Sequence, residues 1–272
     1  MVKIEDYHYY LDELSRIKSL KTGFITNCYL DKAKVDLWIS NGFLYLLKDE
    51  ESFFLLKKNT GFFSLYFFST TESMLKQTLA SLLLHYENTT FVIDILGKER
   101  ESTIIQSFTG FGFQRYQTLV RMNRLGEIKD LKAVDTAALS EATIEDLPVV
   151  SDLLDDYFDP LAEQIPLPAE IEEWINKGQI LVYKEGNKIV GFIIYDLNGG
   201  TLYLRYWFVH PDFREKKIGS KLFNYFYSKG AHTKRQLFWV IESNENAIKR
   251  YKHYGFQEEK MFDLILIKKG NI

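Results

Sequence analysis

The sequence has little cysteine, few histidines and no cluster of metal-binding residue types. Cys28 is the only cysteine among 272 residues, so the chain cannot form an intrachain disulfide, and metal cages made of several cysteines are excluded. The five histidines are scattered and show no paired ligand spacing. We therefore expect no metal cofactor.

The chain also lacks any segment that could span or be exported through a membrane. Its most apolar stretches, such as residues 62–68, are far shorter than the roughly 20 residues that a membrane-spanning helix needs. The N-terminal residues become acidic before any apolar run begins, unlike a secretory signal. We expect a cytoplasmic protein without membrane partners.

A basic excess is missing as well. The formal net charge is −3, whereas a nucleic-acid-binding domain carries a basic patch or stripe, so we expect no nucleic-acid partner. Aromatic residues, in contrast, are abundant: they make up 15% of the chain and include 21 Phe and 17 Tyr. Such bulk can fill the core of one large or two ordinary domains in a chain of this length.

A weak internal repeat favours two domains of one architecture. Gly112-Phe113-Gln114 follows a helical apolar pattern and precedes a strand-like run, and Gly255-Phe256-Gln257 does the same near the other end. Each helical pattern follows a short apolar strand, at residues 91–96 and 237–241. The intervening polar stretch has no sustained apolar pattern and is interpreted as a linker. We predict domains at residues 1–125 and 138–272, joined by a linker at residues 126–137.

The second half alternates between helical and strand-like patterns. A capping-box-like pair, Thr143 and Asp146, predicts a helix start, and the β-branched and aromatic runs within residues 180–195 predict a hairpin. A strand at residues 202–209, a helix from about Ser220 to Lys229 and a final strand–helix–strand unit follow. Antiparallel strands followed by strand–helix units indicate an α/β sandwich.

The stretch from Phe208 to Leu222 has the features of an anion-binding loop. A strand enters a short loop and then a helix, whose first backbone N–H groups lack partners within the helix and lie at its positive end. Gly219 allows a ligand to approach the backbone closely, and Arg214 adds a fixed positive charge. Taken alone, the pattern is equally typical of an ordinary strand–helix connection.

This stretch resembles the acyl-CoA-binding motif of the GNAT superfamily of N-acyltransferases, Arg/Gln-x-x-Gly-x-Gly/Ala after a strand that ends in Val-x-Pro. Arg214 matches the leading position and Gly219 the last one. Lys217 stands where the family usually has its first Gly, and its side chain is long enough to reach a phosphate.

A second motif, Asn244-x-x-Ala247-x-x-x-Tyr251-x-x-x-Gly255-Phe256, resembles the family pattern that follows the next strand. Helical spacing puts Ala247 and Tyr251 on one face. The resemblance implies tandem GNAT-like domains, each with a mixed, mostly antiparallel sheet flanked by helices, and acetyl-CoA as co-substrate. The residues that it implies for cofactor binding are Phe208, Val209, Arg214, Glu215, Lys216, Lys217, Ile218, Gly219, Ser220, Asn244, Ala247 and Tyr251.

The resemblance further implies that a primary amine attacks the thioester directly in a ternary complex. Tyr251 is then the general acid that protonates the leaving thiolate, and the Val209 N–H is a candidate donor to the oxyanion. Alternatively, Tyr251 has only a packing role on its helix, like Phe108 at the equivalent place in the first half. Glu242 is the nearest carboxylate for a general base; its alternative is a solvated strand end, and His210 or a water chain could serve instead.

The first half lacks an equivalent of the anion-binding loop. After a strand at residues 61–68, Ser69-Thr70-Thr71-Glu72 forms a capping box that leads directly into a helix, and no Arg or Gly occurs through Tyr86. Because the helix start is satisfied by the chain's own side chains, we predict that this half binds no CoA. Scaffold, partner surface and part of the acceptor pocket are its candidate roles.

The sequence alone identifies neither the acceptor nor whether the chain is catalytically active. The first two helices of the second half are acidic, so we hypothesise a cationic amine acceptor; solvated helix faces are the alternative. The acidic residues are Asp152, Asp155, Asp156, Asp159, Glu163, Glu170, Glu172 and Glu173. A non-catalytic acyl-CoA-binding sensor or assembly module is the alternative function, and an aminoacyl-tRNA-dependent transferase is disfavoured because the chain lacks a basic bias.

Overall fold

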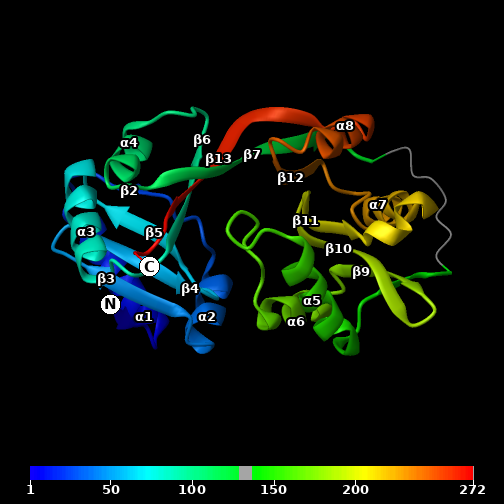
Figure 1. Ribbon diagram of the computed structural model, residues 1–272, viewed down its shortest axis with the longest axis horizontal. Coiled ribbons are helices and arrows are strands. Elements are labelled where there is room, and N and C mark those ends of the chain that lie inside the picture. Colours follow the sequence, from blue (N-terminus) through cyan, green and yellow to red (C-terminus); the bar gives the residue numbers. More distant parts are fainter. Residues whose placement is uncertain (129–136, 272) are drawn as a thin grey trace. The chain divides into compact units, whose positions relative to one another are not determined.

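The computed structural model describes residues 1–128 and 137–271, which form two compact units (Figure 1). Unit 1 comprises Met1–Leu119 and Met261–Ile272, and unit 2 comprises Val120–Lys260. Most of the predicted linker, residues 129–136 of 126–137, lies outside the described residues.

The units differ from the predicted halves, residues 1–125 and 138–272, in the position of two strands. β7 (Gln114–Leu125) begins in unit 1 and ends in unit 2, whereas β13 (Gln257–Lys268) begins in unit 2 and ends in unit 1. The apolar alternation that identifies a strand does not say which sheet the strand joins, because pairing depends on long-range contacts.

Unit 1 is built on a mixed sheet with the strand order β1-β3-β4-β5-β6-β13. Its neighbours are antiparallel except for the parallel pair β5–β6. The elements are β1 (Val2–Lys3), α1 (Tyr7–Ser19), β2 (Ile25–Thr26), α2 (Lys32–Ser40), β3 (Leu44–Lys48), β4 (Ser52–Lys58), β5 (Phe63–Ser69), α3 (Glu72–His85), β6 (Phe91–Gly97) and α4 (Thr103–Gly110), followed by the start of β7 and the end of β13.

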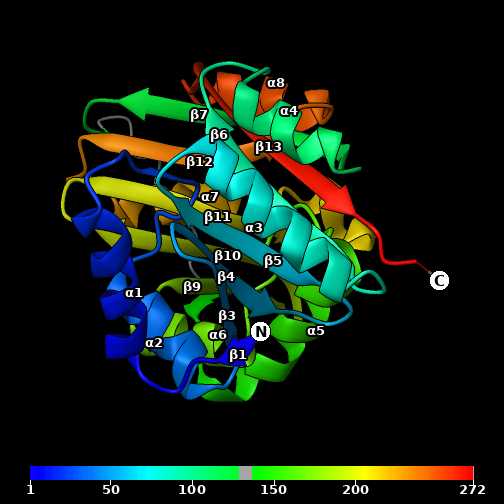
Figure 2. The same ribbon diagram turned by 90° about the vertical axis from the view of Figure 1, so that its left-hand side faces the viewer.

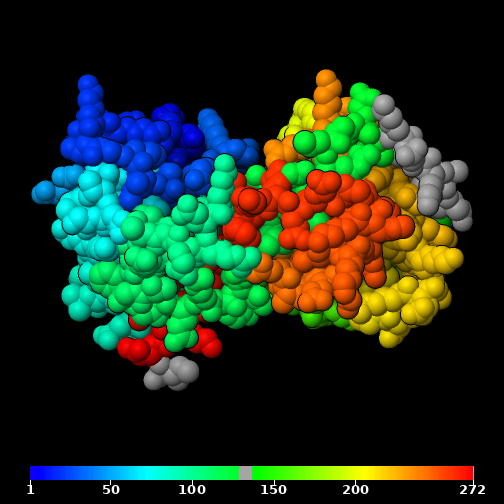
Figure 3. Space-filling view, turned by 90° about the horizontal axis from the view of Figure 1, so that it is seen from above, coloured from blue at the N-terminus to red at the C-terminus, as the bar shows by residue number. Residues whose placement is uncertain are grey.

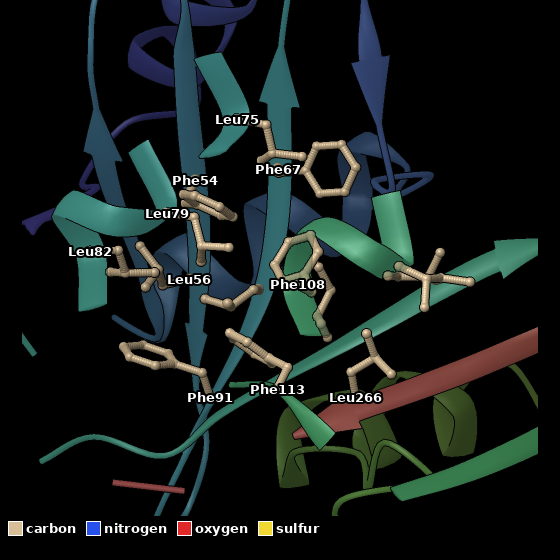
Figure 4. Packing of buried hydrophobic residues seen from close by; sticks show 14 of the residues in the cluster. Phe54, Leu56, Phe67, Leu75, Leu79, Leu82, Phe91, Phe108, Phe113 and Leu266 are labelled. Carbon is tan, nitrogen blue, oxygen red and sulfur yellow. The ribbon is translucent and has the colours of Figure 1, made fainter. Parts of the chain in front are cut away.

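The helices α3 and α4 cover one face of this sheet (Figure 2). Leu75, Leu79 and Leu82 of α3 and Phe108 of α4 pack on side chains from β4, β5, β6 and the end of β13 (Figure 4). The apolar spacing in α3 places its leucines on the side that faces the sheet. On the opposite face, Tyr10 of α1 contacts the Phe68 ring edge-to-face at 5.9 Å.

Unit 2 is also built on a mixed, mostly antiparallel sheet, with the order β7-β12-β11-β10-β9-β8. Its elements besides the end of β7 and the start of β13 are β8 (Leu139–Glu141), the 3₁₀ helix η1 (Ile144–Asp146), α5 (Leu147–Tyr157), α6 (Pro168–Asn176), β9 (Ile180–Glu185), β10 (Lys188–Asn198), β11 (Thr201–Val209), the 3₁₀ helix η2 (Pro211–Lys216), α7 (Ile218–Lys229), β12 (Arg235–Ile241) and α8 (Glu245–His253). The predicted capping box of Thr143 and Asp146 is present, and α7 begins two residues before the predicted Ser220.

Helices lie on both faces of the β9–β11 part of this sheet. Val150, Leu154 and Ile171 of α5 and α6 pack on one face in a cluster with Phe192 and Phe208. On the other face, side chains of α7 pack on β10 and β11, as the Phe223–Trp207 ring contact at 4.7 Å shows. The core of unit 2 therefore consists of two apolar layers with β11 between them.

The predicted fold class is confirmed in both units. Each contains antiparallel strands, then a helix, a parallel strand, a second helix and a long final strand, namely β5-α3-β6-α4-β7 and β11-α7-β12-α8-β13. None of the helices within residues 1–128 and 137–271 is both long and apolar enough to cross a membrane.

Candidate functional site

The candidate site begins where β11 ends and α7 starts. Lys217 is the N-cap of α7, with φ 57° and ψ 21°, so a lysine holds a left-handed conformation that usually favours glycine. This explains why Gly is the usual residue at the corresponding position of the motif. No side chain caps the helix start, and the first N–H groups of α7 are therefore left for a ligand or for water.

Gly219 is required at this helix start for reasons of space. A Cβ atom added there would lie 3.3 Å from Cζ2 of Trp207, which is tight, and 3.5 Å from Cγ2 of Val209, which is an ordinary contact. The backbone of the first turn of α7 thus rests directly on the end of β11. A side chain at this position would need the Trp207 ring to shift by a few tenths of an ångström.

The charged and polar residues of the predicted loop have different roles. Arg214, Glu215 and Lys217 are exposed, whereas Ile218 is fully buried in the core. Lys216 forms an ion pair with Glu185 at 2.7 Å, and Ser220 Oγ accepts a hydrogen bond from the Tyr254 hydroxyl at 3.4 Å. Arg214 forms no ion pair with a described residue, so its charge is available beside the helix start.

The edge of β11 toward β12 is open for most of its length. The two parallel strands pair only at Thr201–Tyr203, and no other strand of the described part of unit 2 covers that edge beyond this point. The N–H of His210 donates to the Val190 carbonyl on β10 at 2.9 Å. Because backbone groups alternate along a strand, the N–H and C=O groups of Val209 and Trp207 then face the open edge.

This alternation separates two residues that the sequence grouped together. Val209 presents its backbone to the open edge, as predicted for a strand that holds an extended ligand. Phe208 presents its backbone to β10, and its side chain lies in the cluster with α5 and α6. Trp207 was missed by sequence reasoning, although counting back two residues from Val209 along a strand indicates it.

The equivalent edge in unit 1 is filled by the chain itself. The strands β5 and β6 pair only at Phe63 and Ser64, and β2 then pairs with the end of β5. The Asn27 side-chain amide donates to the carbonyls of Leu65 and Asp94 at 3.0 Å each, while its oxygen accepts from the Phe67 N–H at 2.7 Å. One side-chain amide thus bridges the two separating strands.

The second motif lies on α8, on the surface of unit 2 (Figure 3). Asn244 caps this helix by accepting a hydrogen bond from the Ala247 N–H at 3.2 Å. One turn further on, the Tyr251 ring lies 5.7 Å from that of Trp207 and 4.1 Å from that of Phe238. The structure therefore brings the two motifs together at the open edge of β11.

Tyr251 and Phe108 occupy equivalent places in the two units. Phe108 is fully buried and its ring lies 6.0 Å from that of Phe67 on β5, in the same way that Tyr251 approaches Trp207 on β11. Tyr251 is only half-buried, and its hydroxyl makes no hydrogen bond with a described residue. Its phenol is free to act on a ligand, whereas Phe108 has only a packing role.

The electrostatics around Tyr251 identify a carboxylate that was not singled out from the sequence. Burial raises the pKa of Tyr251, the Arg250 charge opposes this shift, and the Glu163 charge raises the pKa further. Glu163 lies in the segment between α5 and α6, where burial raises the pKa of its own carboxyl. A raised pKa suits a group that must take up a proton near neutral pH. Its position depends on a loop between helices, which leaves no sequence signal beyond acidity.

Glu242, the candidate base from the sequence, follows β12 directly and is half-buried. His210 is better enclosed than its loop position suggested: its side chain is only 17% exposed. Its Nε2 lies 3.2 Å from the Tyr157 hydroxyl, and its Nδ1 accepts from the Asp212 N–H at 3.4 Å. Glu242 and His210 thus follow the ends of the two strands, β12 and β11, that border the open edge.

The acidic residues of α5, α6 and the segment between them are mostly exposed or bonded to nearby groups of the same region. Asp152, Asp155, Asp156 and Glu172 are exposed. Glu170 accepts from the Leu167 N–H at the start of α6, Glu163 accepts from the Asp159 N–H, and Glu173 pairs with Lys177. Among the described residues, no group of three or more acidic, histidine or cysteine side chains could hold a metal ion.

Comparison with known families and proteins gives one family match. Residues 147–256 match the model of the acetyltransferase (GNAT) family, and they include both motifs and the whole open edge of β11. No curated protein matches the chain.

Several solved structures share the fold over nearly the whole chain. A tandem GNAT protein from the clavulanic acid biosynthesis pathway is 12% identical, with a TM-score of 0.57 and coverage of 92% of this chain and 98% of that one. An acetyltransferase of the GNAT family from Colwellia psychrerythraea is 13% identical, with a TM-score of 0.55 and 97% of both chains covered. A probable N-acyltransferase from Enterococcus faecalis V583 is 9% identical, with a TM-score of 0.61, 98% of this chain and 71% of that chain. At such identities the likeness describes the fold, which both units share.

Proposed function

We propose that this chain, whose residues 147–256 match the model of the acetyltransferase (GNAT) family, transfers an acetyl group from acetyl-CoA to a primary amine of a small molecule or peptide. The family indicates acyl-CoA-dependent acyl transfer in general. The observation that carries the proposal is the uncapped start of α7 beside the open edge of β11, with the free hydroxyl of Tyr251 at the same edge.

The residues present fit acetyl-CoA. The free amides of α7 and the charge of Arg214 suit the pyrophosphate, because a helix N-terminus favours a diphosphate and an arginine pairs with it. The open backbone groups of Val209 and Trp207 suit the amides of the pantetheine arm, which can pair with a strand edge as another strand would. Lys217 adds a flexible positive charge at the helix start.

The residues at the edge can support direct transfer. The co-substrate supplies a thioester carbonyl; the amine nitrogen forms a bond to that carbon, and the carbon–sulfur bond breaks. Tyr251, whose pKa is raised by burial, stays protonated near neutral pH and can donate its proton to the leaving thiolate. The backbone N–H groups at the open edge can donate to the oxyanion.

The amine must lose a proton, and two carboxylates are candidates for accepting it. Glu242 at the end of β12 is the candidate from the sequence. Glu163 is the stronger candidate, because burial raises the pKa of its carboxyl and its charge raises the pKa of Tyr251. The cationic acceptor hypothesised from the acidic helices stays a prediction, although most of those side chains are exposed or cap helices.

For unit 1 we propose that no acetyl-CoA binds. Thr71 caps α3 by accepting from the Met74 N–H at 3.3 Å, and Asn27 occupies the edge of β5 that would hold a pantetheine arm. Both features that favour the ligand in unit 2 are therefore satisfied internally in unit 1.

Thiol release from acetyl-CoA in the presence of a broad amine mixture tests the activity. A Tyr251→Phe variant should lose about 10-fold to 100-fold in kcat and keep the affinity for acetyl-CoA, because it removes only a proton donor. Binding of acetyl-CoA without thiol release above background in the wild type would instead favour the non-catalytic sensor, and equal rates in both proteins would remove the acid role from Tyr251.

A further inference from the structure

The α6 side of the unit 2 sheet carries an arginine that the proposed chemistry does not use. Arg205 is the extra residue of a β-bulge, since Ile194 pairs with Tyr206 and Tyr195 with Leu204. A bulge redirects the side chain of its extra residue, and such irregularities concentrate near functional sites. Asp196 of β10 accepts a hydrogen bond from Nε of Arg205 at 2.5 Å.

The contacts of Asp196 hold this arginine in one orientation. Asp196 Oδ2 binds Arg205, and its Oδ1 accepts from Nε1 of Trp174 on α6 at 2.8 Å. The Tyr203 ring lies 4.1 Å from Cζ of Arg205 and covers one face of the guanidinium. The Asp196 carboxylate is thus committed on both oxygens, and the guanidinium plane is fixed by a ring.

The other end of the guanidinium is not committed. Its terminal nitrogens, Nη1 and Nη2, make no hydrogen bond with a described residue. The side chain keeps 37% of its surface exposed, so a ligand can reach these nitrogens. An arginine that is held in one orientation at Nε while its fork reaches solvent presents two parallel donors, the geometry that matches a carboxylate. An arginine that served only to join β10 and β11 would not need this free end.

Arg205 lies on the α6 side of the sheet, because its partner Asp196 also bonds Trp174 of α6, and the segment that carries the candidate base packs on that side. Tyr206, the next residue, donates hydrogen bonds to the carbonyls of Glu163 and Gln164 at 2.9 Å each. Burial raises the pKa of Tyr206; the Arg205 charge opposes this shift, and the charges of Glu170 and Glu163 add to it. A proton acceptor and a free guanidinium therefore flank the same tyrosine.

We infer that the acceptor carries a carboxylate beside its amine, as a free amino acid does, and that Arg205 binds the carboxylate while Glu163 faces the amine. This inference rests on the proposed acetyltransferase function and names its substrate class. A zwitterion satisfies both groups at once, whereas a polyamine brings further positive charge to the guanidinium and leaves its two terminal nitrogens without a carboxylate partner.

Two pools of acceptors test it. One contains the common L-amino acids and the other contains the same amino acids as α-amides, which keep the amine and the side chain but lack the carboxylate. Because an amide lowers the pKa of its neighbouring amine, intrinsic reactivity favours the amide pool. We expect kcat/KM at least about 10-fold higher with the acids, since a charge-assisted bidentate pair contributes on this scale.

Variants assign the preference to Arg205. Arg205→Gln should lose about 10-fold or more on the acids and little on the amides, while Arg205→Lys should recover part of the loss. Arg115→Gln, which removes an arginine of unit 1 with 43% of its side chain exposed, is the matched control and should change neither pool.

The outcomes separate the inference from the function on which it rests. Equal or better rates with the amides, or an Arg205→Gln variant that slows both pools alike, would overturn the inference and leave the acetyltransferase proposal in place. No thiol release from either pool, alongside release with the broad amine mixture, would overturn the inference alone; no release from that mixture by a protein that binds acetyl-CoA would overturn the catalytic function, and the inference with it.

Discussion

The junction β5–α3 in unit 1 and the junction β11–η2–α7 in unit 2 have the same topology and opposite local chemistry. In unit 1 the strand leads within two residues to Thr71, whose side chain caps the helix, and Asn27 bridges the separating strands. In unit 2 a 3₁₀ helix intervenes, Lys217 takes a left-handed conformation, and neither the helix start nor the strand edge is satisfied by a side chain.

This difference teaches that the fold alone does not make a cofactor site. Both units separate a pair of parallel strands and begin a helix beside the gap. Buried or recessed backbone groups must find partners, and the chain supplies them in unit 1 but not in unit 2. A few side chains therefore decide whether the same architecture is closed or available to a ligand.

A negative side chain at the open junction of unit 2 should have the largest effect on the difference between the two units. Gly219→Glu should weaken acetyl-CoA binding at least about 100-fold, a loss of about 2.7 kcal/mol, because it adds a carboxylate where phosphates bind and a Cβ beside Trp207. Isothermal titration calorimetry measures the change. Ser73→Glu, at an exposed position of the first turn of α3, is the matched control in unit 1 and should leave the affinity unchanged.

Removal of the Asn27 side chain tests the closed junction. Asn27→Ala should cost about 2–3 kcal/mol of unit 1 stability, because it leaves the Phe67 N–H and the carbonyls of Leu65 and Asp94 without this partner. Hydrogen exchange of the β5 and β6 amides reports the loss locally. Asn41→Ala, whose exposed side chain bonds Leu37 O, should cost far less. Similar protection in both variants would mean that Asn27 does not hold the gap closed.

The two ends of β13 should respond to pH in different ways. In unit 2, burial raises the pKa of Glu259, but hydrogen bonds from Arg121 and Arg235 outweigh it and lower the pKa. In unit 1, burial raises the pKa of Asp263, and the Asp94 charge raises it further. Glu259 therefore contributes stability above its unfolded pKa, which is lost only as the pH falls through its lowered folded pKa. Asp263 contributes stability that is fully present below its unfolded pKa and is lost as the pH rises through its raised folded pKa.

When the pH is lowered from 7 to 5, we expect exchange protection to rise several-fold at residues 261–268 and to stay unchanged at residues 257–260. Both values are corrected for intrinsic exchange rates. Asp263→Asn should give the protected state at both pH values. A pH response that survives this substitution would assign the effect to another group.

Lys217→Gly should have the smallest effect. It relieves a left-handed lysine and should stabilise unit 2 by up to about 1 kcal/mol, while the loss of a charge near the phosphates should weaken acetyl-CoA binding several-fold. Lys21, which has φ 56° in unit 1, is the matched control: Lys21→Gly should relieve the backbone without changing the affinity. Equal affinity in both variants would exclude a contact of Lys217 with the cofactor.

The sequence predicts those parts of this account that depend on local patterns. The start of α7 lies within two residues of its predicted position because glycine and the apolar spacing are local signals. The N-cap of α3 lies at Thr71, within the predicted capping segment, but Glu72 accepts a hydrogen bond from the Ser107 hydroxyl instead of closing a capping box. The place of Tyr251 beside β11 follows from a motif on one helix.

The parts that the sequence does not predict depend on long-range contacts. Asn27 reaches Phe67 across 40 residues, and nothing near Asn27 marks it as a bridge. The direction of Arg205 depends on a bulge, which no apolar pattern indicates, and the exchange of β7 and β13 between the units depends on which strand edges meet. The contribution of Glu163 likewise emerges only when its loop is placed near α8.

The stoichiometry of acetyl-CoA binding tests the difference between the two junctions most directly. Titration calorimetry on the full chain should give one site per chain, and that site should disappear in the Gly219→Glu variant. Two sites per chain, or one that persists in this variant, would contradict the account.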